Sequence, residues 1–433
     1  MLKSLKEAFL QNFTCKRNRS VKMSTSRFSD FSSIQCRTRS ALTWFQKIVE
    51  DVVEKERLSM FDEISAAGDV QLVKEMFSCA QNGNAKEVAR IIKADPTRLR
   101  AKNNHGQTAL HVAAAKDHIE VVEVLLEQHP DIDALDNDGN TPLHLAVYAG
   151  ADKIVDLLIK NGAKTNIRNS QLMMPIHVAA ELPNVDVVKS LLSNGVDPNG
   201  IGESGMTALH YAAAKDNGVV MQVLMQRGGK PCWKCDYGYY PIHIAAKCAA
   251  ASAMEAIIEQ AIKQGYTREQ ILSFKDRENN LPLHAAVNGG DIKAVKVCLS
   301  AGASVKAQQE DGSTPLHFAC AQGNMEMIRL MEQMQRDNFL AAVSTVDVLK
   351  MTPLHRAALF NHTPAIVYLL EHGADIDSRD NNERTPLLLA ASKGCWTTVQ
   401  VLLEKGADVH VRDIKNRNFL HLAVKFGGKL EQI

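Results

Sequence analysis

Long hydrophobic runs are absent from this sequence. A helix that crosses a bilayer needs roughly 20 predominantly apolar residues, and no stretch of the 433 residues approaches that length without charged interruptions. We therefore expect this chain, taken alone, to be soluble and cytosolic. A secretory signal is also lacking, because Lys3, Lys6 and Glu7 interrupt the first residues before an apolar core can form.

Sequence motifs that mark enzymes are missing as well. The chain has no phosphate-binding P-loop, no dinucleotide-binding glycine fingerprint, no kinase signature, no nucleophile elbow and no HExxH motif. Acidic pairs such as Asp375 and Asp377 fall in turn-like segments, where short carboxylates cap backbone groups. We predict that the protein is not an enzyme and has no catalytic, cofactor-binding or metal-binding residues. Ligand-binding residues are left unassigned.

Most of the chain has no large excess of charge of either sign. Lys and Arg number 50 against 49 Asp and Glu. Residues 1–40 hold nine of the basic residues and two of the acidic ones, a net charge of +7, so residues 41–433 carry about −6. A mildly acidic body fits nucleic acid poorly, because nucleic acid needs clustered cations along one face. No nucleic-acid partner is expected.

The nine cysteines are odd in number and mostly lie in helical patterns, which fits reduced thiols in the cytosol. The closest pair is Cys232 and Cys235. Four interpretations stay open for it. The two cysteines could be ordinary turn residues, or one could be a thiol made reactive by flanking lysines such as Lys234. They could also form half of a zinc site completed by His243 and Cys248, or a partner-contact patch with the neighbouring Trp and Tyr residues.

One tetrapeptide recurs throughout the sequence. Ten near-copies of Thr-Pro-Leu-His are spaced by 33, 33, 33, 33, 41, 33, 38, 33 and 33 residues. They begin at Thr108, Thr141, Met174, Thr207, Tyr240, Leu281, Thr314, Thr352, Thr385 and Asn418. A 33-residue period with this tetrad is the signature of ankyrin repeats, whose units of a turn and two helices bury their apolar faces against one another. The sequence predicts an all-α ankyrin-repeat solenoid, with hairpin turns and about eleven repeats.

The tetrad has a local physical role. In the copy at Thr141, the threonine oxygen is expected to cap the first helix and Pro142 to occupy the first helical position. The histidine, His144, is expected to bond the cap hydroxyl and a backbone carbonyl of the adjacent unit. Nine of the 15 histidines hold this place and are predicted to be structural: His111, His144, His177, His210, His243, His284, His317, His355 and His421.

Glycines and acidic turns are expected to close each unit. Segments such as 136–139 (Asp-Asn-Asp-Gly) and 310–312 (Glu-Asp-Gly) predict hairpin-type turns between units. In five units the glycine after the second helix is predicted to be left-handed. These glycines are Gly162, Gly195, Gly302, Gly373 and Gly406.

Three regions follow from the pattern. Residues 1–40 are basic and Ser-rich and predict a flexible tail. The alternatives are a mitochondrial presequence and an amphipathic stretch lying on an anionic bilayer. Residues 41–74 predict a helical lead-in. Residues 75–433 predict the solenoid, whose first unit, from Phe77, is an atypical capping repeat.

The period breaks in two intervals and at the end. The intervals of 41 and 38 residues hold extra residues near 261–272 and 336–345. Such insertions usually go to loops on one face and often mark a contact surface, and a functionally neutral longer turn is the alternative. The tetrad at Asn418 opens a repeat that is incomplete at Ile433. We expect further sequence or a partner to cover the apolar face of that repeat.

Segments that depart from the repeat consensus resemble one family, the ankyrin-subfamily transient receptor potential (TRPA) cation channels. The likeness covers roughly residues 75–433, both long intervals included, and is nearer to invertebrate members than to vertebrate ones. The segments that carry it are 229–232 (GKPC), 240–243 (YPIH), 264–268 (QGYTR), 173–177 (MMPIH), 297–299 (VCL), 354–360 (LHRAALF) and 416–422 (NRNFLHL).

This resemblance implies a function. The family comprises tetrameric, calcium-permeable channels of the plasma membrane that irritant electrophiles or temperature open. They have a cytosolic ankyrin region ahead of six membrane helices. The chain would be the N-terminal portion of that region, a sensor and interaction arm at the cytoplasmic face of the membrane. Its partners would be other proteins or channel subunits, in a homotetramer if the full channel forms. The alternative is a soluble ankyrin-repeat scaffold that binds proteins. No pore or electrophile-site residue transfers, because no matching position exists in this chain.

Overall fold

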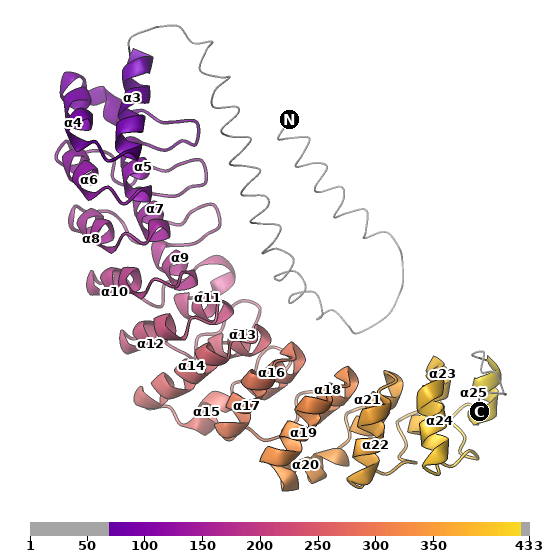
Figure 1. Cartoon of the computed structure of the whole chain (residues 1–433). Coiled ribbons are helices and arrows are strands. Elements are labelled where there is room, and N and C mark those ends of the chain that lie inside the picture. Colours follow the sequence, from indigo (N-terminus) through magenta and orange to yellow (C-terminus); the bar gives the residue numbers. More distant parts are fainter. Residues whose placement is uncertain (1–68, 426–433) are drawn as a thin grey trace. The chain divides into compact units, whose positions relative to one another are not determined.

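Helices joined by short turns make up the part of the chain that the structure describes. A computed structural model describes residues 69–425 (Figure 1), and these contain 23 α-helices, two 3-10 helices and no strand. The prediction of an all-α fold is therefore confirmed. The predicted tail and residues 41–68 of the predicted lead-in lie outside the described residues.

The helices form two parallel rows. In the first row each helix packs on the next, and the same holds in the second row. The first row is α3 (Asp69–Gln81), α5 (Ala109–Ala115), α7 (Pro142–Ala149), α9 (Pro175–Glu181), α11 (Ala208–Ala214), α13 (Pro241–Lys247), α16 (Pro282–Gly289), α18 (Pro315–Gln322), α21 (Pro353–Leu359), α23 (Pro386–Lys393) and α25 (Phe419–Lys425). The second row is α4 (Ala85–Ala94), α6 (Ile119–Leu126), α8 (Asp152–Lys160), α10 (Val185–Ser193), α12 (Gly218–Gln226), α14 (Ala251–Lys263), α17 (Ile292–Ser300), α19 (Met325–Met334), α22 (Thr363–Glu371) and α24 (Trp396–Glu404). Four short helices belong to neither row. Each lies along the chain between a second-row helix and the next first-row helix, and they are η1 (Pro96–Arg100), η2 (Glu203–Gly205), α15 (Arg268–Leu272) and α20 (Arg336–Val343).

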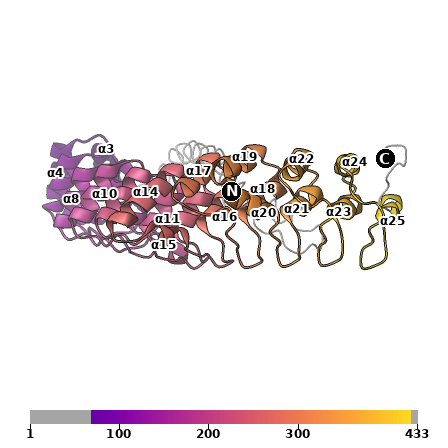
Figure 2. The same cartoon turned by 90° about the horizontal axis from the view of Figure 1, so that it is seen from below.

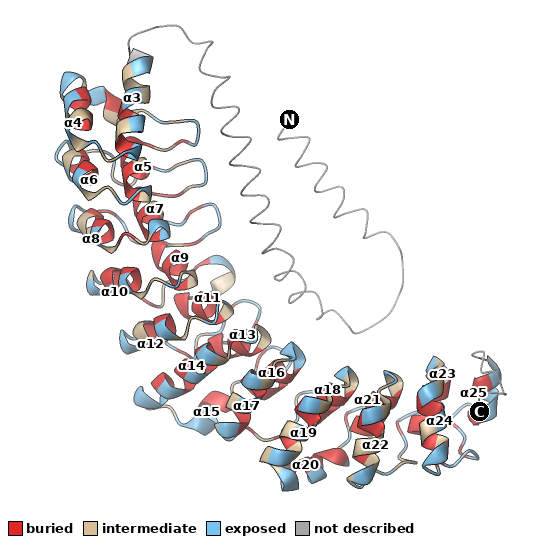
Figure 3. Ribbon diagram, viewed as in Figure 1, coloured by how far each residue is buried: buried red, intermediate tan, exposed pale blue. Residues whose placement is uncertain are grey.

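The core is a continuous layer between the two rows. In α7, Leu143 and Val147 are fully buried, as are Ile154 and Leu158 in α8. These residues recur at helical spacing on one face of each helix. Figure 3 shows the buried residues along the facing sides of the helices. Because every unit buries its apolar face on its neighbours, the stability of the array depends on the contacts between units.

The tetrad begins every first-row helix after α3, as predicted. Thr141 is the N-cap of α7 with extended backbone angles, its hydroxyl accepts a hydrogen bond from the N–H of His144, and Pro142 follows it at the start of the helix. The predicted left-handed glycines are also confirmed. Their φ values are 92° at Gly162, 81° at Gly195, 104° at Gly302, 85° at Gly373 and 87° at Gly406.

The extra residues of the two long intervals fold differently from the expectation. They were expected in loops, but the first interval lengthens α14 to Lys263 and adds α15, and the second adds α20. The reason is apolar burial, since Ile271 is fully buried in α15 and Phe339 in α20. The expected boundary at residue 74 falls inside α3, which runs unbroken from Asp69 to Gln81.

Candidate interaction surface

Tetrad histidines connect each unit to the next. The ring Nδ1 of His144 lies 3.2 Å from the backbone nitrogen of Thr141, whose N–H donates to it, and 2.9 Å from the threonine Oγ1. Its Nε2 lies 3.1 Å from the carbonyl oxygen of Met173 in the following unit. Each of the tetrad histidines from His111 to His355 bonds a carbonyl of the next unit in this way. The predicted bond to a carbonyl of the adjacent unit is confirmed for these eight, and the predicted bond to a cap hydroxyl for the five that follow a threonine cap.

Burial keeps these imidazoles neutral. Loss of hydration lowers the pKa of His177, His210, His284 and His317 to about 4 each, although each ring bonds a backbone carbonyl. A neutral ring with the proton on Nε2 can donate to the carbonyl and accept from the N-cap N–H at the same time. The histidines are therefore linkers between units.

A row of loops, here called fingers, joins the units. In Figure 2 the loops between the later units project on one side of the helices. The fingers are residues 102–107, 135–140, 168–173, 201–206, 234–239, 275–280, 308–313, 346–351, 379–384 and 412–417. In seven of them the second residue is Asn or Asp, and its side-chain oxygen accepts two backbone N–H bonds that close the turn. This chemistry is typical of Asx turns.

Backbone hydrogen bonds also connect neighbouring fingers. The N–H of Asn137 donates to His105 O over 2.9 Å, and the N–H of Ser170 donates to Asp138 O over 2.9 Å. Further along, Val348 N–H donates to Asp311 O over 2.7 Å. Because side chains and backbone both fix the fingers, their tips form a row of preorganised contact points, which is the favourable condition for binding a partner.

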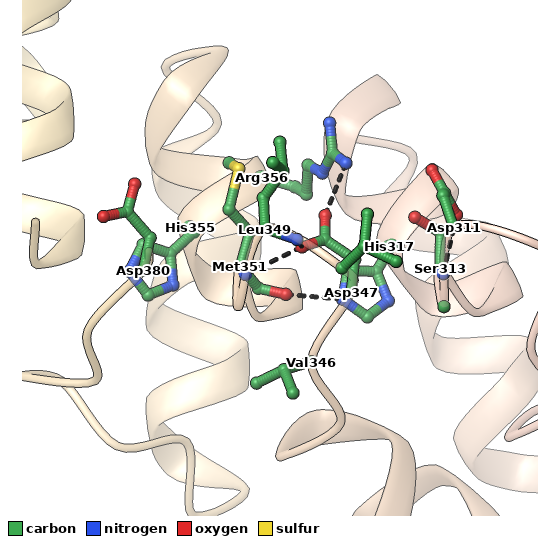
Figure 4. Close-up of polar contacts among 12 residues, drawn as sticks. Asp311, Ser313, His317, Val346, Asp347, Leu349, Met351, His355, Arg356 and Asp380 are labelled. Carbon is green, nitrogen blue, oxygen red and sulfur yellow. Dashed lines mark hydrogen bonds and ion pairs between the residues drawn. The ribbon is translucent and has the colours of Figure 1, made fainter. Parts of the chain in front are cut away.

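One finger is held by a buried ion pair. The guanidinium Nη2 of Arg356 lies 2.6 Å from Oδ2 of Asp347, whose side chain is fully buried (Figure 4). The other carboxylate oxygen accepts N–H bonds from Leu349 and Met351, each over 2.8 Å. Arg356 follows the tetrad histidine, where other units carry apolar residues such as Val112. The pair therefore ties α21 to its own finger.

Burial alone would raise the pKa of Asp311 in the neighbouring finger. Hydrogen bonds from Gln309 and Ser313 outweigh that effect and, with the charge of Arg356, hold the pKa of Asp311 below its usual value. Figure 4 shows Asp311 and Ser313 beside the ion pair. The Asp311 carboxylate is therefore charged near neutral pH.

The unit that begins at Tyr240 lacks several of these supports. Cys235 holds the place that Asn or Asp occupies in seven other fingers, and Tyr240 replaces the capping threonine. The side chain of Tyr240 makes no cap bond and stacks on Phe274 with ring centres 4.7 Å apart. His243 keeps its bond to Asn280 O, over 2.9 Å, but its buried Nδ1 has no partner. At its tetrad this unit therefore has fewer hydrogen-bond supports than the units capped by threonine.

Cys232 and Cys235, the two closest cysteines, lie in different environments. Cys232 is exposed and accepts a hydrogen bond from the Tyr266 hydroxyl over 3.3 Å, whereas Cys235 is buried. Both are free thiols. Within residues 69–425 no three or more His, Cys, Asp or Glu side chains cluster in a way that could hold a metal ion. Thiol reactivity and the contact patch stay predictions. Aligning the ten fingers by their second residue is the sequence signal that would have marked Cys235, with Gly202 and Gln309, as a departure from Asn or Asp.

A second polar cluster lies where α20 meets α22. Phe339 packs edge-on against Tyr368 and His372, with ring centres 6.3 and 5.7 Å away. Glu332 bonds the Tyr368 hydroxyl and lies 3.2 Å from His372 Nε2. The hydrogen bond from Tyr368, its largest influence, lowers the pKa of Glu332. The cluster fixes the inserted helix onto the next unit.

Comparison with known proteins defines the class of protein. A sequence model described as ankyrin repeats matches residues 76–169, 176–268, 248–337, 283–380 and 335–413. These stretches cover most of the chain, and the chain belongs to the ankyrin-repeat family.

Within that family, the chain is similar to TRPA channels. It is 47% identical over 139 residues to transient receptor potential cation channel subfamily A member 1 of Drosophila melanogaster, which is 32% of this chain and 12% of the channel. It is 38% identical over 132 residues to the Homo sapiens protein of that name, 30% of this chain and 12% of the channel. The resemblance to TRPA channels is thus confirmed at the level of sequence. The matched part spans about an eighth of each channel's length.

A third relative has a different name. The chain is 30% identical over 127 residues to NF-kappa-B inhibitor alpha of Gallus gallus, which is 29% of this chain and 40% of the inhibitor.

In the described part of the chain, no helix combines the length and the apolar character that crossing a bilayer requires.

Proposed function

We propose that this chain is the ankyrin-repeat sensor and interaction arm of a TRPA-type, calcium-permeable cation channel at the cytoplasmic face of the plasma membrane. One observation carries the proposal. The identity to the fly channel is 47% over 139 residues, against 30% over 127 residues for the NF-kappa-B inhibitor. Ankyrin proteins share the repeat consensus, so we attribute the excess identity to residues beyond it.

The proposed role is mechanical and does not involve catalysis. The histidine bridges and the bonds between fingers link each unit to the next, so a displacement at one unit passes to its neighbours. Channel subunits, in a homotetramer, and cytosolic proteins are the proposed partners. Thermal sensing would use partial unfolding, because repeat arrays open in neighbour-coupled steps. The unit at Tyr240 is where we expect the first opening.

A chimeric channel tests the assignment. The matched 139 residues of the fly channel are replaced by those of this chain, and currents are recorded in cells in response to the fly channel's stimuli. The control chimera carries the matched ankyrin segment of the chicken NF-kappa-B inhibitor instead. We expect gated currents from the first chimera only. Equal currents from both, or none from either when both reach the cell surface, would count against the proposal.

Calorimetry of the chain separately tests the proposal that the array senses temperature by partial unfolding. Graded unfolding predicts a broad transition that begins near physiological temperature. A single sharp transition far above that temperature would exclude thermal sensing by this array, and would leave the channel assignment standing.

A soluble scaffold is the second candidate function. The similarity to the NF-kappa-B inhibitor and the preorganised row of fingers favour it. It predicts that the chain binds a protein partner with full affinity when no channel subunit is present, measured with purified components.

A further inference from the structure

Finger 346–351 differs from the others in what it exposes. Val346, Val348 and Leu349 in this finger are 44%, 61% and 51% exposed. The other fingers expose at most one large apolar side chain each. Two fingers further along, Ile414 is 61% exposed at the corresponding tip. We call Val348, Leu349 and Ile414 the apolar tips.

The apolar tips carry a basic fringe. Lys350, Arg412 and Lys415 are exposed, and in the described part of the chain none of them forms an ion pair. The acidic residues of fingers 346–351, 379–384 and 412–417 are each neutralised. The pairs are Asp347 with Arg356 at 2.6 Å, Asp380 with Arg384 at 2.7 Å, Glu383 with Arg379 at 3.0 Å and Asp413 with Arg417 at 2.5 Å. The surplus charge of this surface is positive. Exposed Glu310 and half-buried Asp311, both in the preceding finger, form its acidic edge.

The backbone beneath the apolar tips is fixed. Val348 N–H donates to Asp311 O over 2.7 Å, and Leu349 O accepts from Asn381 N–H over 2.8 Å. The N–H of Ile414 donates to Asn382 O over 3.1 Å. The aliphatic side chains therefore stay in water because the fold holds them there, and binding would need little further ordering.

The occupant that fits this combination is an anionic lipid bilayer. The apolar tips belong to loops that project from the helices (Figure 2). A deformable surface can accommodate side chains on separate projecting loops. A bilayer interface accepts aliphatic side chains at the acyl boundary, while lysine and arginine reach the headgroup phosphates. We propose that fingers 346–351 and 412–417 form a docking surface for an anionic bilayer. The surface is argued independently of the channel assignment.

Vesicle co-sedimentation of the full chain tests the proposal. The vesicles are phosphatidylcholine alone or with about 30% phosphatidylserine, a fraction that gives the surface a negative potential. The apolar variant is V348S with L349S, and the charge variant is K350Q with K415Q. The matched control is L172S, which removes a leucine that is 49% exposed on finger 168–173.

We expect the apolar variant to bind anionic vesicles about ten-fold more weakly. The charge variant should lose about five-fold for each lysine, and only on anionic vesicles. L172S should bind like the unchanged protein. All changed side chains are exposed, so thermal unfolding should be the same in each variant.

The basic residues 1–40, with a net charge of +7, contribute equally in every variant. If the apolar and charge variants bind like L172S, that segment alone explains vesicle binding and the proposal is wrong. Hydroxyl-radical footprinting adds a local readout. Anionic vesicles should lower the oxidation of Leu349 and Ile414 and leave that of Leu172 unchanged. Unchanged oxidation at all three would mean that the fingers do not enter the bilayer and that the proposal is wrong.

Discussion

Substituting His144 with alanine removes the connection between two units, and the structure sets the size of the effect. Removing the ring abolishes three contacts, which are those with the Thr141 N–H, the Thr141 hydroxyl and Met173 O. Met173 O keeps a hydrogen bond from Asn169 N–H, so the group left without a partner is the buried Thr141 N–H. At about 1 kcal/mol for each net hydrogen bond, and about 1 more for the orphaned N–H, we expect a loss of about 3–4 kcal/mol.

His243 supplies the matched comparison. The same substitution there leaves a similar cavity but removes only the bond to Asn280 O, because Nδ1 already lacks a partner. The expected cost of hydrogen bonds is about 1 kcal/mol, which is about 2–3 kcal/mol less than at His144. Urea unfolding followed by circular dichroism measures the difference, and amide exchange in α7 and α13 locates the opening. An H243A cost equal to or larger than that of H144A would refute the reasoning.

Four further outcomes follow from the same contacts. His177, His210, His284 and His317 have pKa values of about 4 when folded and about 6.5 when unfolded, so the unfolded chain binds more protons between these values. Stability should therefore fall by up to about 1.4 kcal/mol per histidine for each pH unit between about 6.5 and 4, and urea midpoints that do not move between pH 7 and 5 would contradict this. R356L leaves the buried Asp347 carboxylate without its cation and should cost about 3 kcal/mol, whereas R356K should recover part of the loss in the same urea assay. F339A should cost about 3–4 kcal/mol and speed amide exchange in α20, and unchanged exchange there would show that the insertion is held by other contacts. C235N should gain about 1 kcal/mol by accepting the two turn N–H groups that Asn and Asp accept elsewhere, and a thermal midpoint below that of the unchanged chain would show that this turn cannot use the amide.

The repeated parts of the molecule could be predicted because their chemistry is local. The tetrad places a cap, an N1 proline and a histidine within four residues, and the left-handed glycines depend only on their own helix ends. The bond from His144 to Met173 O crosses to another unit but recurs with the period, so one correct inference covered eight histidines.

The irregular parts could not be predicted because long-range packing decides them. Whether the residues around Phe339 form a loop or a helix depends on Tyr368 and His372, which belong to the next unit. The pairing of Arg356 with Asp347 depends on how a helix lies over its finger, which composition does not reveal. The apolar tips stand out only once the register of all ten fingers is known.

Sequencing the transcripts through and beyond the codon for Ile433 tests the channel assignment most directly. The assignment predicts a reading frame that continues into further ankyrin repeats and six membrane-spanning helices. An in-frame stop directly after Ile433, with no alternative transcript encoding membrane helices, would contradict it.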